Sequence, residues 1–319
     1  MSKVLLECQH LKKYFDTPVG KLHAVDDVSF KLEEGKTLGV VGESGCGKST
    51  LGRTILGLLP STDGKVIFDG EEIQNNSKKE MLPLRKEMQI IFQDPYSSLN
   101  PRMTVSQLIA EPLRIHNIYK TKAEVEARVA ELMKTVGLAE RYVNTYPHEM
   151  DGGRRQRVGI ARALALNPKF IVCDEPVSAL DVSIQAQVLN LMMDLQDQLG
   201  LTYIFITHNL SVVKHISDDI AVMYLGQMVE KTPSEELFSN PLHPYTQALL
   251  KAIPIPSLGY KNKITNVLKG EITSPIEPKP GCRFAPRCPY ATERCTTVTP
   301  ELKEAAPNHF VACHMVGEQ

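Results

Sequence analysis

Residues 42–49 read Gly42-Glu43-Ser44-Gly45-Cys46-Gly47-Lys48-Ser49, which matches the phosphate-loop pattern G-x-x-x-x-G-K-[ST] at every position. An apolar run at 38–41 precedes the motif, and a run with helical character at 50–58 follows it. A phosphate loop folds in this strand–loop–helix order, so a chance glycine-rich turn explains the pattern poorly. The motif predicts a site for a nucleoside triphosphate, but it does not choose among kinases, GTPases, AAA proteins and transporters.

The residue types in this loop suit phosphate binding. Glycines let the backbone wrap around phosphates and direct its N–H groups inward, at a helix N-terminus that already favours anions. We expect Lys48 to reach the β- and γ-phosphates and the Ser49 hydroxyl to join the shell of a Mg²⁺ ion. The predicted phosphate-binding residues are Gly42, Ser44, Gly45, Cys46, Gly47, Lys48, Ser49 and Thr50.

Cys46 lies inside the phosphate loop, where its thiol would sit beside the first turn of the following helix. A helix N-terminus lowers the pKa of a nearby thiol, and the thiolate is the form that reacts. The sequence therefore predicts that alkylation of Cys46 inhibits nucleotide hydrolysis and that bound nucleotide protects the thiol.

The composition is that of a globular protein with a sizeable core. The chain has 319 residues, of which 42% are apolar and 23% charged, and its formal net charge is -1. With so little net charge, nucleic-acid binding as the main role is not supported. The N-terminus lacks the pattern of a secretory signal, and no apolar run reaches the roughly 18 residues that span a bilayer. We expect a chain kept in the cytosol, with membrane contact only through partner proteins.

The order of apolar runs predicts an α/β fold. Short runs at 38–41, 170–173 and 203–206 lack polar alternation, as strands covered on both faces do, and helical stretches at 122–136 and 184–198 lie between them. Such an order is typical of a mostly parallel sheet with crossover helices. Beyond about residue 239, prolines interrupt the chain and regular periodicity is lost, which indicates a domain boundary.

Four further positions resemble motifs of ABC ATPases, in the order along the chain that this family has them. Residues 170–176, Phe-Ile-Val-Cys-Asp-Glu-Pro, look like the Walker B strand. The resemblance implies that Asp174 holds Mg²⁺ through water and that Glu175 is the base that polarises the attacking water. Taken alone, a carboxylate pair at a strand end is equally well read as a solvated turn.

Residues 178–181, Ser-Ala-Leu-Asp, resemble the D-loop and assign Asp181 to the nucleotide site. His208, after the next apolar strand, matches the switch histidine, although a lone histidine is more often structural. Gln93 matches the Q-loop glutamine, which senses the γ-phosphate, reaches the Mg²⁺ ion and couples to the membrane subunits. Each match is weak by itself, and their order in one chain is what identifies the family.

The segment 11–15, Leu-Lys-Lys-Tyr-Phe, resembles the A-loop, whose aromatic ring stacks on adenine. Spacing favours Phe15, with Tyr14 as the alternative. The competing interpretation is a core aromatic on an edge strand.

The family signature Leu-Ser-Gly-Gly-Gln is altered here to Met150-Asp151-Gly152-Gly153-Arg154. A serine hydroxyl donates to a phosphate oxygen, whereas an ionised Asp151 only accepts and repels phosphate. Arg154 would offset part of that repulsion, and Asp151 would also serve as a helix N-cap. We expect a heterodimer in which a sister ATPase supplies an intact signature over the ATP held by this chain.

Seven cysteines are present, and four of them, Cys282, Cys288, Cys295 and Cys313, fall near the end of the chain. In a proline-rich segment with little core they suggest a metal that holds the segment together. Their spacing is not that of a standard zinc ribbon, and four cysteines also suit a 4Fe–4S cluster. Zinc and free or oxidised thiols stay as alternatives.

This tail, together with residues 243–250 and 94–101, resembles the C-terminal extension of peptide and nickel importer ATPases. Members of that family carry a 4Fe–4S cluster, which the resemblance assigns to the four cysteines. It implies a P-loop ABC ATPase core at 1–238, with an antiparallel β subdomain and a helical subdomain at about 94–160. An irregular, cysteine-containing extension at 239–319 would follow.

The implied function is ATP-driven peptide uptake across the cytoplasmic membrane, with ATP and Mg²⁺ as cofactors. The implied partners are a second ABC ATPase, two transmembrane permeases and an extracytoplasmic substrate-binding protein, and the chain would lie peripherally on the cytoplasmic face. Nickel or oligosaccharide cargo stays open. A soluble, non-transport ABC ATPase is the rival class, but the tandem cassettes or coiled-coil insertions common there are missing from this sequence. A regulatory, inert subunit would have no need of Glu175 and His208.

Overall fold

The computed structural model describes residues 3–253 and 274–316, so parts of the predicted extension, 254–273 and 317–319, lie outside the described residues. The chain forms two compact units. The first is built mainly from Asn75–Ile206 and includes Glu33–Lys36, and the second combines Val4–Leu32, Thr37–Gln74 and Thr207–Gln319. The predicted domain boundary near residue 239 stays a prediction.

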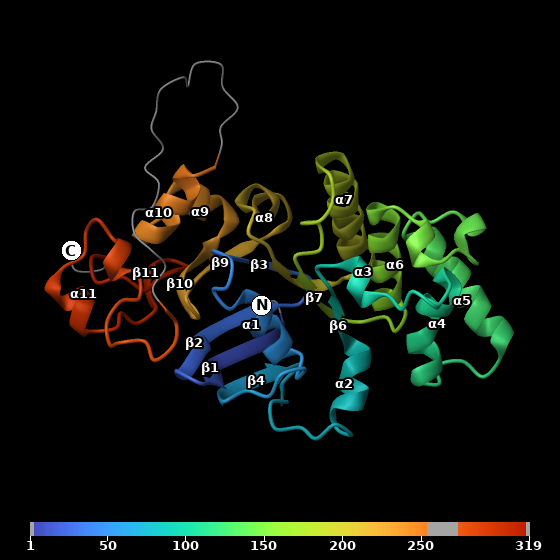
Figure 1. Ribbon diagram of the computed structural model, residues 1–319, viewed down its shortest axis with the longest axis horizontal. Helices are drawn as coiled ribbons and strands as arrows, with labels where there is room; N and C mark the ends of the chain where they lie inside the picture. Colours follow the sequence, from blue (N-terminus) through green and yellow to red (C-terminus); the bar gives the residue numbers. More distant parts are fainter. Residues whose placement is uncertain (1–2, 254–273, 317–319) are drawn as a thin grey trace, which may run out of the picture. The chain divides into compact units, whose positions relative to one another are not determined.

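In the second unit, the N-terminal half forms the expected antiparallel β subdomain. Its strand order is β2-β1-β4-β5, and Figure 1 shows β1, β2 and β4 side by side. Paired residues such as Leu6 and Phe68, or Cys8 and Val66, are buried, so one face of this sheet packs into a core. The strand bounds are β1 Val4–Thr17, β2 Gly20–Glu33, β4 Asp63–Phe68 and β5 Glu71–Glu72.

The same unit contains a second set of strands in the order β11-β12-β10-β9-β3. β3 runs parallel to β9, and the remaining neighbours are antiparallel. Every residue of β3 is buried, as its unbroken apolar sequence predicts. The bounds are β3 Thr37–Val41, β9 Asp219–Tyr224, β10 Gln227–Pro233, β11 Lys303–Ala306 and β12 His309–Val311.

Helices of this unit pack around these strands. α1 follows the phosphate loop, α8 packs on β3, and α9 packs on β9 and β10 (Figure 1). The tail, by which we mean the extension that begins at about residue 239, adds α10, a 3-10 turn η3 and α11. The bounds are α1 Lys48–Ile55, α8 Leu210–Ile216, α9 Ser234–Ser239, α10 Pro244–Lys251, η3 Ala285–Arg287 and α11 Glu293–Thr297.

The tail is less irregular than its sequence predicts. β12 pairs with β10, with Val311 opposite Glu230, and β11 pairs with β12. The sequence does not predict β11, because this strand is short and mostly exposed and therefore lacks the apolar alternation that marks a strand. The extension is thereby joined to β10, β9 and β3 within this unit.

The first unit contains three parallel strands in the order β8-β7-β6, and α7 connects β7 to β8. This confirms the predicted strands at 170–173 and 203–206 and the helix at 184–198. The bounds are β6 Met88–Ile91, β7 Phe170–Asp174, α7 Val182–Leu199 and β8 Thr202–Ile206.

The segment between β6 and β7 is helical, as expected. Capping boxes start α4 and α5, where Thr104 pairs with Gln107 and Thr121 with Glu124. Figure 1 shows these helices and α6 together, in green. The bounds are α2 Met81–Glu87, α3 Pro95–Ser98, α4 Val105–Ile115, α5 Lys122–Thr135, η1 Glu140–Tyr142, η2 Pro147–Glu149 and α6 Gly152–Leu164.

Among the described helices, none has both the length and the apolar character needed to cross a bilayer.

Candidate nucleotide site

The phosphate loop joins the buried β3 to α1, and its glycines fit a close backbone approach. Gly42 and Gly47 have φ of 150° and 103°. A Cβ on Gly42 would lie 2.1 Å from the carbonyl oxygen of Met223, and one on Gly47 would lie 1.9 Å from that of Ala24. No side chain fits at either position, so the glycines of the motif are required by packing as well as by the phosphate-binding geometry.

Lys48 is held at the loop. Its side chain is buried, and Nζ donates to the carbonyl oxygens of Gly42 at 2.9 Å and Glu43 at 3.0 Å. The ammonium group is therefore positioned by the loop that the sequence assigns to phosphate binding. Ser49 and Thr50 lie in the first turn of α1, while Ser44 and Gly45 are exposed at the tip of the loop.

Cys46 differs from its prediction. The side chain is only 3% exposed, and burial raises the pKa of its thiol, with the neighbouring Lys48 acting in the opposite direction. The expectation of a lowered thiol pKa is wrong because desolvation outweighs the effect of Lys48. Inhibition by alkylation of Cys46, and protection by bound nucleotide, stay predictions. The sulfur faces inward, so an added Cβ on Gly42 would come within 2.8 Å of it.

The A-loop candidates have different surroundings. The Tyr14 hydroxyl donates to Asp26, and the Tyr14 ring stacks on His23 with centroids 3.9 Å apart. The ring of Phe15 has Lys13 Nζ 4.7 Å from its centroid. Burial opposes ionisation of Asp26, but the hydrogen bond from Tyr14 and the charge of Arg283 lower the pKa of this carboxyl. Which aromatic stacks on adenine stays a prediction.

The structure brings Gln93 and Glu175 together. Asp174 is the last residue of β7 and is 1% exposed. Glu175, the next residue, has a φ of 49°, and its N–H donates to the carbonyl of Ile206 at 2.9 Å. Gln93 Nε2 donates to Glu175 Oε2 at 3.1 Å. A positive φ in a non-glycine residue is unfavourable, and it turns Glu175 out of the strand direction that Asp174 follows. The two carboxylates thus have distinct surroundings.

Asp151 is the N-cap of α6, as one of its two interpretations expects. One carboxylate oxygen accepts from the main-chain N–H of Arg154 at 2.8 Å, and the other pairs with Arg154 Nη1 at 2.6 Å. The Arg154 guanidinium also lies over the Tyr142 ring, 5.0 Å from its centroid. Arg154 therefore neutralises the carboxylate that replaces the signature serine.

The signature glycines and the D-loop are neighbours. A Cβ on Gly153 would lie 2.6 Å from Ile184 Cγ2, and one on Gly152 would lie 3.0 Å from Leu180 Cδ2. Asp181 caps α7 by accepting from the Ile184 N–H at 3.0 Å. The glycine pair lets α6 approach the start of α7 closely.

His208 is exposed and follows Thr207, whose N–H donates to the carbonyl of Val40 at 3.1 Å. It belongs to the unit that contains the phosphate loop and Tyr14, whereas Gln93, Glu175 and the signature belong to the other unit. The functional roles of these residues stay predictions.

Sequence reasoning missed the tail residues that contact the phosphate loop. The N–H of Glu43 donates to the Tyr245 hydroxyl at 2.9 Å, and Arg287 binds the Glu43 side chain. No motif marks these positions, because the contact depends on how the tail folds back within its unit.

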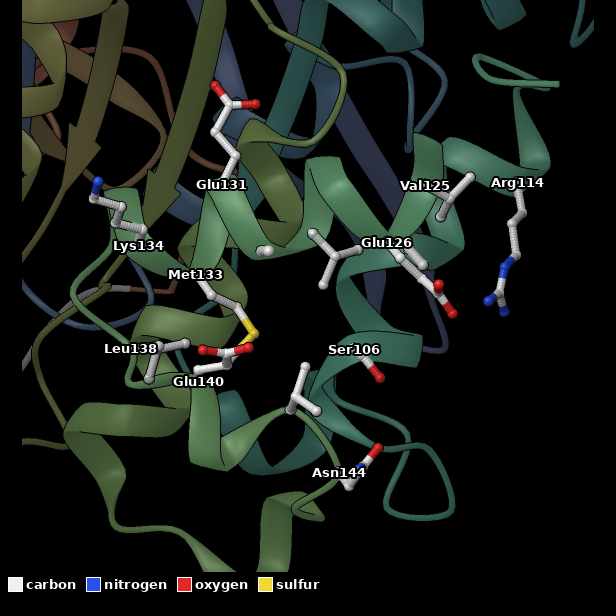
Figure 2. Close-up of a pocket in the computed structure, with 14 residues that line it drawn as sticks. Ser106, Arg114, Val125, Glu126, Glu131, Met133, Lys134, Leu138, Glu140 and Asn144 are labelled. Atoms are coloured by element: carbon white, nitrogen blue, oxygen red, sulfur yellow. The ribbon is translucent and has the colours of Figure 1, made fainter. Parts of the chain in front are cut away.

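A pocket of about 730 Å³ lies in the helical segment, between residues of α4, α5 and the stretch after α5 (Figure 2). Its lining residues include Ser106, Glu126, Met133 and Asn144. It contains none of the residues predicted for the nucleotide.

The four tail cysteines line one small cavity, together with His243 and Phe284. All four are free thiols. Burial raises the pKa of Cys282 to about 11 and also raises those of Cys288 and Cys313. Within residues 3–253 and 274–316, no group of three or more His, Cys, Asp or Glu residues is arranged to hold a metal ion.

Comparison with known proteins agrees with the motifs. A family model described as ABC transporter matches residues 25–178, and one described as oligopeptide/dipeptide transporter, C-terminal region, matches residues 229–295. The chain is 53% identical to the oligopeptide transport ATP-binding protein AppF of Bacillus subtilis, with 98% of each chain covered. It is also 53% identical to OppF of Escherichia coli, covering 98% of this chain and 96% of OppF.

Solved structures give the same fold. The ATP-binding cassette MJ0796, a dimer bound to ADP and Pi, superposes with a TM-score of 0.66 at 28% identity over 72% of this chain and 99% of its own. CbiO1 from Clostridium perfringens also has a TM-score of 0.66 at 28% identity, over 75% of this chain and 92% of its own. The chain belongs to the family of ATP-binding subunits of oligopeptide ABC transporters.

Proposed function

We propose that this chain hydrolyses ATP on the cytoplasmic face of the membrane to drive peptide uptake, as one of two different ATPase subunits. Peptide as the cargo is supported by relatives named oligopeptide transport ATP-binding proteins and by the match to the C-terminal region of peptide transporters. Two permeases and an extracytoplasmic binding protein complete the proposed importer. The catalytic assignment rests on one contact: Gln93 donates a hydrogen bond to the side chain of Glu175, the residue that directly follows β7.

The proposed mechanism assigns a role to each motif. Lys48 and the N–H groups of the phosphate loop bind the phosphates and neutralise the charge that develops on them. Glu175 takes up the proton of the attacking water, Gln93 holds the carboxylate in place, and His208 contacts the γ-phosphate. Asp174 and Ser49 offer the hard oxygen ligands that Mg²⁺ prefers, and the metal supplies charge neutralisation when bound.

The signature supports the heterodimer. Both carboxylate oxygens of Asp151 accept hydrogen bonds from Arg154. The start of α6 therefore has no serine hydroxyl that could donate to a γ-phosphate across a dimer interface. A sister subunit with an intact signature would complete the site formed by this chain's phosphate loop and Glu175. The composite site that uses Asp151 would be the weaker of the two.

For the tail, we infer that the four cysteines bind a 4Fe–4S cluster. The chemical type of the donors supports this, since four thiols line one cavity and thiolates are the ligands of such clusters. The described residues do not have a metal-binding arrangement, so thiol deprotonation and closer approach would have to accompany binding. Anaerobic purification with iron and sulfide analysis tests this: four irons per chain, lost in Cys295→Ser, are expected. Stoichiometric zinc, or no metal at all, would contradict the cluster.

The experiment for the importer is co-purification from native membranes in mild detergent, followed by mass spectrometry. We expect two permeases and a second ATPase whose signature carries the serine, with substrate-binding protein recovered under low salt. Recovery of this chain alone, from the soluble fraction, would contradict the proposal and favour a non-transport ATPase.

A further inference from the structure

We propose that the cysteine-bearing tail positions the nucleotide site through two arginines, Arg287 and Arg283, so that ATP affinity depends on the tail. Arg287 acts on the phosphate loop, and Arg283 acts on the segment that carries Tyr14. The proposal rests on the assignment of residues 42–49 as the phosphate loop. All of the contacts below lie within one compact unit.

Arg287 binds the second residue of the phosphate loop in a bidentate pair. Its Nη1 lies 2.8 Å from Glu43 Oε2, and its Nη2 lies 3.0 Å from Glu43 Oε1. The Arg287 side chain is 5% exposed and that of Glu43 is 24% exposed. A parallel, two-bond pair fixes orientation as well as distance, and burial protects it from screening by salt. The tail thus fixes the direction of the Glu43 side chain.

The main chain of Glu43 is also held from the tail. Its N–H donates to the Tyr245 hydroxyl at 2.9 Å, while its carbonyl oxygen accepts from Lys48 at 3.0 Å. Tyr245 packs against Tyr224 and Phe284, with ring centroids 4.7 Å and 5.4 Å away. Arg287 Nη1 also donates to the Tyr224 hydroxyl at 3.3 Å. The peptide that orients the phosphate-binding lysine is therefore fixed by residues outside the motif.

Arg283 makes a second connection. Its guanidinium donates to the carbonyl of Leu225 and to Asp26, and the same carboxylate accepts from Tyr14. The side chains of Arg283 and Asp26 are 7% and 14% exposed. Next to Leu225, Gly226 donates its N–H to the carbonyl of Cys46 at 2.8 Å and accepts from the N–H of Asp26 at 2.8 Å. Arg283 thus links the tail to the segment that carries Tyr14 and, through Leu225 and Gly226, to the middle of the phosphate loop.

Both arginines belong to one short turn of the tail. Arg283 follows Cys282, and Arg287, the last residue of η3, precedes Cys288. Both Nη groups of each arginine donate to protein acceptors, so we assign the two residues a positioning role rather than contact with ATP. A loop that is already in its binding conformation loses less entropy when ATP binds, which appears in affinity more than in turnover at saturation.

The test measures ATP binding and turnover in the purified transporter with Arg287→Met. We expect the Kd for ATP and the KM to rise at least fivefold while kcat at saturating ATP stays within twofold. Glu43→Gln should give a similar rise, and the double variant should be no worse than either single change, since both remove one interaction. Arg287→Lys, which keeps the charge without the bidentate geometry, should recover part of the affinity.

The matched control is His309→Gln, which alters another tail contact. His309 Nε2 lies 2.7 Å from Glu230 Oε1 in a buried pair that joins β12 to β10. This variant should lower Tm and leave the Kd for ATP unchanged. An Arg287→Met protein with lower Tm but unchanged Kd and KM would overturn the proposal. If Arg287→Met does not fold, Glu43→Gln decides by the same criterion, with an unchanged Kd and KM overturning the proposal. Unaltered ATP binding in Lys48→Ala would instead refute the phosphate-loop assignment.

Discussion

At the residue scale, Asp151 occupies the position of the serine in the family signature. It caps α6 as a serine would, but it carries a charge that Arg154 must offset. Ser and Asp are comparable N-caps, and an exposed ion pair contributes little, about 0–1 kcal/mol. We therefore expect the cost of the substitution to fall on phosphate recognition and not on the stability of the helix.

Asp151→Ser should leave the free energy of unfolding within about 1 kcal/mol of the parent, whereas Asp151→Ala should lose about 1 kcal/mol more because the cap is removed. In the assembled transporter, the serine variant should hydrolyse ATP faster, as the second composite site gains a hydroxyl donor. Chemical denaturation and steady-state turnover check the two effects. A serine variant as unstable as the alanine variant would contradict the capping role.

His243 provides a second residue-scale prediction. Its buried ring Nδ1 accepts from the Tyr245 N–H at 3.0 Å, which requires an unprotonated nitrogen, and burial lowers its pKa from 6.5 to about 4. The main-chain N–H of His243 also donates to the carboxylate of Glu230. Below pH 6.5 the unfolded chain binds a proton that the folded chain does not, so stability falls as the pH falls from 6.5 towards 4.

The loss from this group should reach about 2 kcal/mol at pH 5, since each pKa unit corresponds to roughly 1.4 kcal/mol. His243→Asn keeps an acceptor for the Tyr245 N–H but does not titrate. Denaturant unfolding of both proteins between pH 7.5 and 5 should show a steeper fall for the parent. Parallel curves would mean that His243 titrates normally in the folded protein.

At the element scale, the packing of α6 against α7 depends on glycine. In Gly153→Ala the new methyl group would meet Ile184 Cγ2 at 2.6 Å, so α6 or α7 must shift, at a cost of about 1–3 kcal/mol. Gly159→Ala on the same helix is the matched control. Nothing lies within 4 Å of its added Cβ, and it should stabilise α6 by about 0.5–1 kcal/mol.

Thermal and denaturant unfolding of the two variants check this prediction. Equal effects at the two positions would show that the approach of α6 to α7 is not set by the glycine pair.

The elements also show what the sequence could and could not predict. β3, β7 and β8 are continuous apolar runs, so their burial and position were predictable from the sequence. β11 and β12 were not, because strands of four and three residues are specified by their pairing partners and not by their own pattern: β11 pairs with β12, and β12 pairs with β10. The prediction of a lowered pKa for Cys46 was wrong for a related reason: the motif gives the position of the thiol along the chain but not its burial.

At the scale of the whole molecule, the tail is joined to the ATPase core within the second unit. β12 extends the strands next to β10, and Phe284 and Tyr245 belong to the same buried cluster as Val41 at the end of β3. The motifs in the sequence locate Gln93, Glu175 and Asp151, and the structure adds how the first two meet and how Arg154 holds the third. Contacts between the tail and residue 43 join positions more than two hundred residues apart, which no local pattern encodes.

In the proposed peptide importer, Glu175 is the group that activates water for ATP hydrolysis. The most direct measurement is single-turnover ATP hydrolysis by the reconstituted transporter that carries Glu175→Gln, beside ATP binding by the same protein. We expect an unchanged Kd for ATP and a hydrolysis rate lower by about 100-fold or more, equivalent to roughly 2.7 kcal/mol of lost transition-state stabilisation. A hydrolysis rate within threefold of the parent would contradict it and assign the catalytic base to another residue.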